Sequence, residues 1–226
     1  MKRRIRAYLG YGAGLALRKF AFTLILLWPS FVSAEALRVS FLGDSLVQGY
    51  GLAPEQGLVP KLQSWLRQAG VEVEMINAGV SGDTTSGGLA RIAWTLSDKP
   101  DALLVALGGN DVLRGLDPGL AEQNLAGILE AAAQAEVPAM LFGFDAPSNY
   151  GPEYETAFEG LYGSLAKQFD VDLHPGFWVA FQGLGAQELQ TWLQGDMIHP
   201  NVRGVEKIVD LIGPSIQDFL QKQAGP

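Results

Sequence analysis

Apolar and polar positions follow two alternating patterns from residue 37 onward. Short runs of consecutive apolar residues, typical of buried strands, are followed by longer segments whose apolar residues recur every three or four positions, typical of helices. The predicted strands cover residues 37–42, 71–76, 102–107, 137–144 and 171–173. The predicted helices cover residues 54–69, 86–96, 118–135, 153–169, 187–193 and 202–220.

This alternation predicts an α/β fold, in which helices cover both faces of a parallel sheet. Because crossovers between parallel strands are right-handed, a five-stranded sheet favours a flavodoxin-like, three-layer α/β/α arrangement with the strand order 2-1-3-4-5. Open sheets of this kind bind ligands in the crevice where the order reverses, here between the first and third strands. We therefore expect functional residues in the loops that follow the strands.

Three of these loops carry candidate chemical groups. Ser45 follows the first strand, so a rigid element holds it and yet exposes it, as a nucleophile requires. The loop at 77–83 contains Gly79, where the absence of a Cβ atom lets a backbone N–H approach a substrate. Asn110 follows the third strand and offers a side-chain NH₂ donor. A nucleophile with such donors is suited to acyl transfer.

A base for this serine is available near the other end of the chain. The sequence has two histidines, and one of them, His199, follows closely after Asp196. The proline after His199 favours an extended backbone, which places the pair in a loop just before the last predicted helix. Asp196 would orient His199, and His199 would take the proton of Ser45. The sequence therefore predicts that these three residues converge on the crevice.

Other polar residues of these loops have simpler structural interpretations. Ser81 is a rival nucleophile, but its surroundings lack the last glycine of an elbow motif, so a hydrogen bond within a turn is the default. Asp44 and Asp111 are interpreted as turn or capping carboxylates. His174 precedes Pro-Gly and is interpreted as a structural turn residue, with a place in the pocket wall as the alternative.

The first 34 residues have the pattern of a secretory signal peptide. Basic residues precede an apolar run at 20–28, and small residues follow, so cleavage is expected after Ala34 or after Ala36. The run is shorter than the roughly 20 residues that span a bilayer. A later start codon or an uncleaved anchor is the alternative. We expect a single domain over residues 35–226, exported to the periplasm of a Gram-negative bacterium or secreted.

Removal of this segment makes the charge of the chain more negative. Six of the 16 basic residues and none of the 24 acidic residues lie in 1–34, so the net charge changes from −8 to −14. Such a surface argues against nucleic acid or anionic lipid headgroups as partners. The absence of cysteine excludes disulfides and thiolate chemistry, and two distant histidines without an HExxH motif predict no metal site.

Taken together, the motifs resemble those of the SGNH group of GDSL hydrolases, which is named for Ser, Gly, Asn and His. The matching blocks are, in order, Gly43-Asp44-Ser45-Leu46, Gly79 within 77–83, Gly109-Asn110-Asp111 and Asp196-Met197-Ile198-His199-Pro200. Within this family the chain is most similar to the bacterial periplasmic thioesterase I, lysophospholipase and arylesterase group. The similarity covers nearly all of residues 37–220 and includes the stretches 81–84, 88–91, 107–115 and 147–151.

The resemblance implies a role for each of these residues. Ser45 would be the nucleophile and, through its own N–H, the first oxyanion donor. The N–H of Gly79 and the side chain of Asn110 would complete the oxyanion hole. His199 would be the general base, and Asp196 would be its orienting partner.

The resemblance also implies that residues 145–150 form a loop beside the acyl pocket, with these residues in contact with substrate: Asp145, Pro147, Asn149 and Tyr150. Asp145 departs from the basic or neutral residue expected there, so a different acyl-chain or leaving-group preference is expected. Met197 is a second departure, because a smaller residue is commoner at its position.

The sequence thus predicts a serine esterase that needs no cofactor and forms an acyl-enzyme. Its expected substrates are small acyl esters, together with acyl thioesters or lysophospholipids. We expect a monomer that binds no nucleic acid and is not inserted in a membrane after cleavage. Two alternatives stay open, namely a carbohydrate O-deacetylase with the same triad and a non-catalytic lipid-binding protein.

Overall fold

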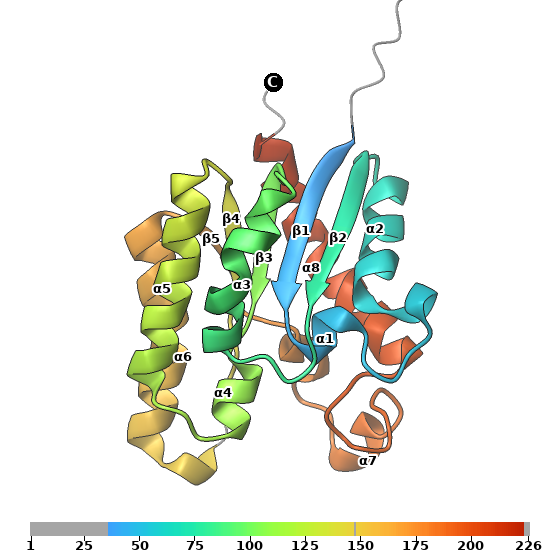
Figure 1. The fold of residues 1–226 in the computed structure, drawn as a ribbon. Coiled ribbons are helices and arrows are strands. Elements are labelled where there is room, and N and C mark those ends of the chain that lie inside the picture. Colours follow the sequence, from blue (N-terminus) through green and yellow to red (C-terminus); the bar gives the residue numbers. More distant parts are fainter. Residues whose placement is uncertain (1–35, 147, 224–226) are drawn as a thin grey trace, which may run out of the picture. The chain divides into compact units, whose positions relative to one another are not determined.

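A computed structural model of the protein describes residues 36–146 and 148–223, so the predicted signal peptide lies outside the described residues. Five parallel strands form one sheet in the described ranges, in the order β2-β1-β3-β4-β5 (Figure 1). The strands are β1 (Leu37–Gly43), β2 (Val73–Gly79), β3 (Ala102–Ala106), β4 (Ala139–Phe142) and β5 (Asp172–His174). This arrangement confirms the predicted α/β fold and the predicted strand order.

Helices cover both faces of the sheet. On one face α2 packs against α8, and on the other α3, α5 and α6 lie side by side (Figure 1). The long helices are α2 (Leu58–Gln68), α3 (Thr85–Ser97), α5 (Pro118–Gln134), α6 (Pro152–Phe169) and α8 (Val202–Gln223). Strands β1, β3 and β4 are almost fully buried between these layers, and their aromatic and aliphatic side chains form the core.

Local capping explains where several helices begin. The Oγ1 atom of Thr84 accepts the N–H of Gly87 at the start of α3, and Asp117 accepts the N–H of Gly119 at the start of α5. The predicted helix 54–69 is divided, because Gly57 adopts an extended conformation between the 3₁₀ turn η1 (Pro54–Gln56) and α2.

The structure has two short helices at the carboxyl ends of strands that the sequence pattern did not predict. α1 (Ser45–Gln48) follows β1 directly, and α4 (Gly109–Leu113) follows β3. Each is too short to show a helical period in the sequence. The segment predicted at 187–193 forms the shorter α7 (Ala186–Leu189), and two further 3₁₀ turns are η2 (Ser148–Tyr150) and η3 (Trp178–Phe181).

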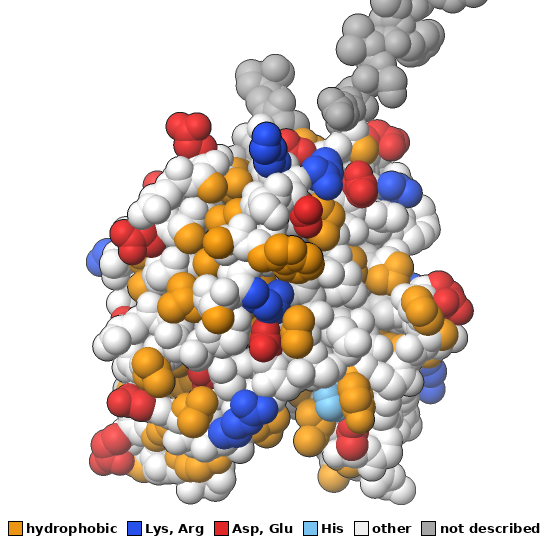
Figure 2. Space-filling model, viewed as in Figure 1, with side chains coloured by type: hydrophobic (Ala, Val, Ile, Leu, Met, Phe, Trp, Pro, Cys, Tyr) orange, Lys and Arg blue, Asp and Glu red, His pale blue; other side chains and the backbone are white. Residues whose placement is uncertain are grey.

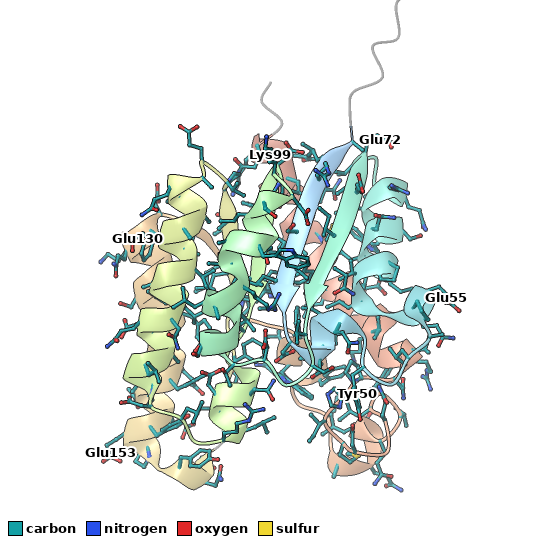
Figure 3. All side chains as sticks on the ribbon, viewed as in Figure 1. Tyr50, Glu55, Glu72, Lys99, Glu130 and Glu153 are labelled. Atoms are coloured by element: carbon teal, nitrogen blue, oxygen red, sulfur yellow. The ribbon has the colours of Figure 1, made fainter. Side chains whose placement is uncertain are left out.

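The two edges of the sheet differ in what lies there. The carboxyl edge carries α1, α4 and α7, whereas β1 begins and α8 ends at the amino edge (Figure 1). Lys222 at the end of α8 pairs with Asp172 at the start of β5, with a distance of 3.0 Å. Figure 3 shows Tyr50 at the carboxyl edge, and Glu72 and Lys99 at the amino edge. Within the described ranges, no helix is long and apolar enough to cross a membrane.

Candidate active site

Three predicted side chains meet beside the carboxyl end of β1. The Nε2 atom of His199 lies 2.8 Å from Oγ of Ser45. The Nδ1 atom of the same ring lies 2.6 Å from Oδ2 of Asp196. Ser45 is the first residue of α1, and the other two residues lie in the loop before α8. This geometry lets His199 accept a proton on Nε2 while it donates Nδ1–H to the carboxylate.

Asp196 is held in its charged form by hydrogen bonds. Its Oδ1 atom accepts the backbone N–H groups of His199 and Ile198, each at 3.0 Å. These donors and the ring of His199 lower the pKa of Asp196 to about 2, and the backbone N–H of His199 has the largest effect. The carboxylate is therefore ionised at neutral pH, and it faces Nδ1 of His199.

Two residues that the motifs did not indicate hold the histidine loop in place. The ring of Tyr50 packs on that of His199, with 4.5 Å between the centroids. Gln194 donates from Nε2 to the carbonyls of Tyr50 and Pro200, at 2.8 and 3.0 Å, and its N–H donates to the carbonyl of His199 at 2.7 Å. Gln194 thereby joins the loop after α1 to the loop before α8.

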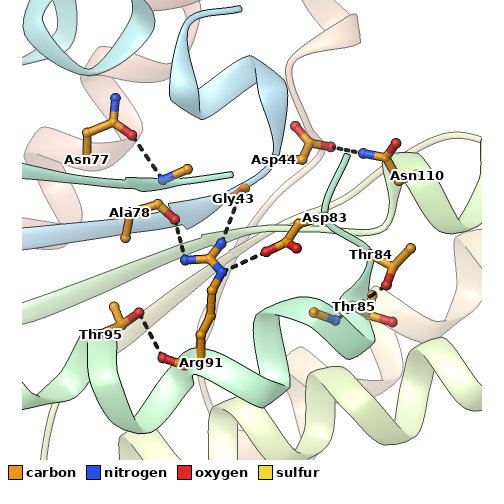
Figure 4. Close-up of polar contacts among 12 residues, drawn as sticks. Gly43, Asp44, Asn77, Ala78, Asp83, Thr84, Thr85, Arg91, Thr95 and Asn110 are labelled. Atoms are coloured by element: carbon orange, nitrogen blue, oxygen red, sulfur yellow. Dashed lines mark hydrogen bonds and ion pairs between the residues drawn. The ribbon is translucent and has the colours of Figure 1, made fainter. Parts of the chain in front are cut away.

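Asp44 links the serine loop to Asn110. Its Oδ1 atom accepts the N–H of Leu46 at 3.0 Å, which confirms its predicted capping role. Its Oδ2 atom accepts Nδ2 of Asn110 at 3.3 Å (Figure 4). Burial raises the pKa of Asp44 to about 6, and these bonds oppose the rise. Since an amide nitrogen carries two hydrogens, Asn110 keeps one donor for the cavity that it lines.

The structure does not place Gly79 on the wall of the cavity. The N–H of Gly79 donates to Oδ1 of Asn77 at 2.9 Å, and this glycine is not among the residues that line the cavity. It is small because a Cβ atom would collide with the backbone of α1 at Gln48. Gly82, in the same loop, does line the cavity and has a φ of 81°. The sequence shows two glycines here and no signal that separates them.

The remaining polar residues of these loops have structural roles. The hydroxyl of Ser81 donates to Oε1 of Gln48 at 2.6 Å, as expected for a turn. Asp111 accepts the N–H and the hydroxyl of Thr85, at 2.9 and 2.7 Å, and so caps α3. His174 is buried, its Nδ1 atom accepts the N–H of Gly176 at 3.0 Å, and burial lowers its pKa. These contacts confirm the structural interpretations.

The candidate site opens into a cavity of about 650 Å³. Ser45, Asn110 and His199 lie on its floor or wall, and Figure 2 shows hydrophobic side chains gathered along the hollow at this edge. The apolar part of the lining consists of Leu46, Val112, Leu113, Phe144, Ala146, Trp178, Met197 and Ile198. The cavity therefore joins a cluster of polar side chains to an apolar wall, a combination typical of ligand sites.

Comparison with known proteins identifies the family. A sequence profile of the GDSL-like lipase/acylhydrolase family matches residues 41–207. The chain belongs to this family. It is 37% identical over 188 residues to esterase TesA of Pseudomonas aeruginosa, and the aligned region covers 83% of this chain and 91% of the relative. It is 38% identical over 205 residues to the thioesterase 1/protease 1/lysophospholipase L1 of Escherichia coli K12, and here the aligned region covers 90% of each protein.

Solved structures of this family agree with the fold described above. The crystal structure of AlinE4, an SGNH-hydrolase esterase, has a TM-score of 0.68 and 42% sequence identity over 82% of this chain and 97% of that chain. A crystal structure of TesA has a TM-score of 0.73 and 36% identity over 80% of this chain and 98% of that chain. The predicted class, a serine esterase of the SGNH group, is therefore confirmed.

The structure places only part of the predicted substrate loop of this GDSL hydrolase in the cavity. Asp145 lines the wall and is exposed to solvent. Asn149 and Tyr150 lie in η2 and do not line the cavity. The ring of Tyr150 packs on Tyr154 instead, and its hydroxyl donates to the carbonyl of Leu113 at 3.4 Å. Pro147 lies outside the described residues.

Met197 has an unusual backbone in this GDSL hydrolase. Its φ of 59° lies in the left-handed region, which favours glycine, and its side chain lines the mouth of the cavity. Glycine adopts this conformation without strain, which fits the smaller residue that the resemblance implies at this position. The methionine thus adds apolar surface next to His199 despite a backbone conformation that costs energy for a larger residue.

A second hollow of similar size lies at the amino edge of the sheet. Its volume is about 660 Å³, and its lining includes Glu136, Asp170 and Lys222 but no predicted site residue. Size alone therefore does not locate the site of this GDSL hydrolase. No group of three or more metal-ligating side chains is assembled in the described parts of the chain.

Proposed function

We propose that Ser45 is the nucleophile of this esterase, that His199 is its general base and that Asp196 orients His199. The observation that carries this assignment is the continuous set of contacts from Oγ of Ser45 through the imidazole to the Asp196 carboxylate, at 2.8 and 2.6 Å. A serine hydroxyl becomes a competent nucleophile when a base takes its proton. Ser81 has no such partner, because its hydroxyl donates to Gln48.

The reaction follows from this geometry. Oγ of Ser45 attacks the acyl carbonyl carbon while its proton passes to Nε2 of His199, and the charged Asp196 stabilises the imidazolium. The tetrahedral intermediate then expels the alcohol or thiol, which receives the proton from His199. A water molecule attacks the acyl-enzyme in the same way and releases the carboxylic acid, so that Ser45 regains its proton.

Three donors are available for the oxyanion. The N–H of Ser45 is at the start of α1, where N–H groups have no partner within the helix. The side chain of Asn110 supplies the second donor. We assign the third to the N–H of Gly82, which lines the cavity, in place of that of Gly79, which is bonded to Asn77. Donors aimed at developing charge supply a large share of catalysis in acyl transfer.

The substrates proposed are acyl esters, and also acyl thioesters and lysophospholipids. The apolar wall supports an acyl chain as the part that is bound, because burial of each CH₂ group contributes about 0.8 kcal/mol. A carbohydrate would require more polar partners than this wall offers. The complete set of reactive groups supports turnover over simple lipid binding.

We propose further that the protein is exported after removal of residues 1–34 or 1–36. The basic residues, the short apolar run and the small residues before Ala34 support this proposal. Intact-mass measurement of the protein from a periplasmic extract tests it. The expected mass corresponds to cleavage after Ala34 or Ala36, and a full-length mass in the membrane fraction would contradict it.

The central test compares Ser45→Ala with Ser81→Ala. Both variants remove one hydroxyl from the same region of the structure. We expect Ser45→Ala to lose p-nitrophenyl butyrate hydrolysis and labelling by a fluorophosphonate, whereas Ser81→Ala keeps both. Labelling that persists in Ser45→Ala and disappears in Ser81→Ala would transfer the nucleophile to Ser81. A series of substrates from C2 to C16 then measures the acyl-chain preference.

A further inference from the structure

Arg91 lies on α3, outside the cavity, and contacts three residues in the segments that lead to the candidate active site. Its Nη2 atom donates to the carbonyl of Gly43 at 2.9 Å, and its Nη1 atom donates to the carbonyl of Ala78 at 2.7 Å. Its Nε atom pairs with Oδ2 of Asp83 at 2.6 Å. Figure 4 shows the three contacts converging on one guanidinium group. Arg91 itself does not line the cavity.

The positions of these partners along the chain give the contacts their significance. Gly43 is the last residue of β1, two positions before Ser45. Ala78 and Asp83 lie on either side of the segment that contains Gly82, so Arg91 holds that segment at both ends. The carbonyl of Gly43 also accepts the N–H of Val80 at 3.0 Å, which joins the two loops directly.

The chemistry of the side chain suits this connection. A guanidinium is planar and presents its N–H donors in a fixed fork, whereas an ammonium is a compact point charge. The side chains of Arg91 and Asp83 are each 18% exposed, so water competes weakly for their bonds. Lysine at this position retains the charge but cannot reach three acceptors with the same geometry.

We propose that Arg91 is a positioning residue that fixes the nucleophile loop relative to the oxyanion loop. It acts through the backbone, because its bonds end at carbonyls and a carboxylate next to the reactive groups and not at the substrate. The proposal rests on the proposed roles of Ser45 and Gly82. Oxyanion donors must lie about 2.7–3.1 Å from the developing charge, and a displacement of about 1 Å can lower a rate by about 10².

The experiment compares Arg91→Lys and Arg91→Met with a control at the opposite end of β2. There, Nε of Arg67 donates to the carbonyl of Val73 at 2.9 Å, so Arg67→Met also removes an arginine–carbonyl bond from the same strand. For each variant, kcat and KM with p-nitrophenyl butyrate are measured per folded protein, together with the melting temperature. Wild-type turnover and its loss in Ser45→Ala test the proposed function separately.

We expect Arg91→Lys to lower kcat by about tenfold and Arg91→Met by about 10², with KM changed less than about twofold. Arg67→Met should lower the melting temperature and leave kcat unchanged. If Arg91→Met does not fold, Arg91→Lys decides. The proposal is overturned if Arg91→Lys retains wild-type kcat, if KM rises while kcat stays constant, or if Arg67→Met loses kcat to the same extent.

Discussion

The imidazole Nε2 of His199 lies 2.8 Å from the hydroxyl of Ser45, although the two residues are 154 positions apart in the chain. The sheet order explains this approach, because β1 ends near the centre of the carboxyl edge and the loop before α8 returns to the same edge. The first strand and the segment before the last helix are therefore both needed to bring these two side chains together.

Asn110→Ala removes a proposed oxyanion donor and is expected to lower kcat by about 10²–10³. Steady-state hydrolysis of p-nitrophenyl butyrate measures this effect. Asn124→Ala is a matched control, because Asn124 is a buried amide that donates to Thr85 at 3.0 Å and does not line the cavity. The control should change stability alone, and unchanged turnover in Asn110→Ala would remove Asn110 from the mechanism.

Gly82→Ala tests the reassigned oxyanion glycine. Alanine is strained at a φ of 81°, and we expect about 1 kcal/mol of lost stability together with a kcat about tenfold lower, because the N–H of this residue moves. Gly70→Ala is the control: its φ is 86°, nothing lies within 4 Å of an added Cβ atom, and Gly70 is remote from the cavity. Equal losses of kcat in both variants would contradict the assignment of Gly82.

Asp196→Asn removes the carboxylate that faces Nδ1 of His199. We expect kcat to fall by about 10²–10⁴, because the amide favours the wrong tautomer of the imidazole. The variant retains an oxygen for the N–H groups of Ile198 and His199, so the loop should keep its shape. A normal melting temperature with low kcat is the expected pair of measurements, and a kcat within twofold of wild type would refute the orienting role.

The low pKa of Asp196 also has a consequence for stability. Its value of about 2 lies below the usual 3.8, so ionisation of this carboxyl favours the folded state. This contribution is complete above about pH 3.8 and disappears as the pH falls through about 2. Acid unfolding, followed by circular dichroism, should therefore be less steep for Asp196→Asn than for wild type, and identical curves would contradict this linkage.

Asp44→Asn should separate stability from activity. Burial raises the pKa of Asp44 to about 6 from 3.8, so ionisation of this carboxyl opposes folding. Its unfavourable contribution grows as the pH rises from about 3.8 to about 6 and is constant above that range. The melting temperature of Asp44→Asn relative to wild type should thus increase between pH 4 and pH 7.

The same substitution should lower kcat, since the amide that replaces the carboxylate presents a donor to Nδ2 of Asn110 and displaces it. Melting temperatures across the pH range and kcat at pH 7 provide both measurements. A pH-independent difference in melting temperature would contradict the raised pKa, and an unchanged kcat would contradict the coupling of Asp44 to Asn110.

The sequence predicted the order of the strands, because right-handed crossovers between parallel strands allow few strand orders. It predicted the ends of the individual strands less accurately. β2 extends to Gly79, whereas residues 77–79 have the composition of a turn. They form a strand because they pair in register with β1, where Gly79 lies opposite Gly43. This pairing is a tertiary effect that no local pattern records.

In the candidate site, too, some residues could be predicted from the sequence and others depend on tertiary contacts. Ser45, Asn110 and His199 lie in motifs with a characteristic order, so the sequence predicted them as candidates, and the structure brings all three to one cavity. Tyr50 and Gln194 contribute packing and backbone hydrogen bonds between distant loops, and such contacts leave no motif. The choice between Gly79 and Gly82 depended on which N–H was already bonded, which only the folded chain reveals.

Both ends of the described domain lie at the edge of the sheet opposite the cavity, where β1 begins and Lys222 of α8 pairs with Asp172. Attachment to a solid support through either end would therefore leave the mouth of the cavity turned toward the solution. Immobilised enzyme linked at its amino terminus and enzyme linked at its carboxyl terminus should retain comparable access for substrate.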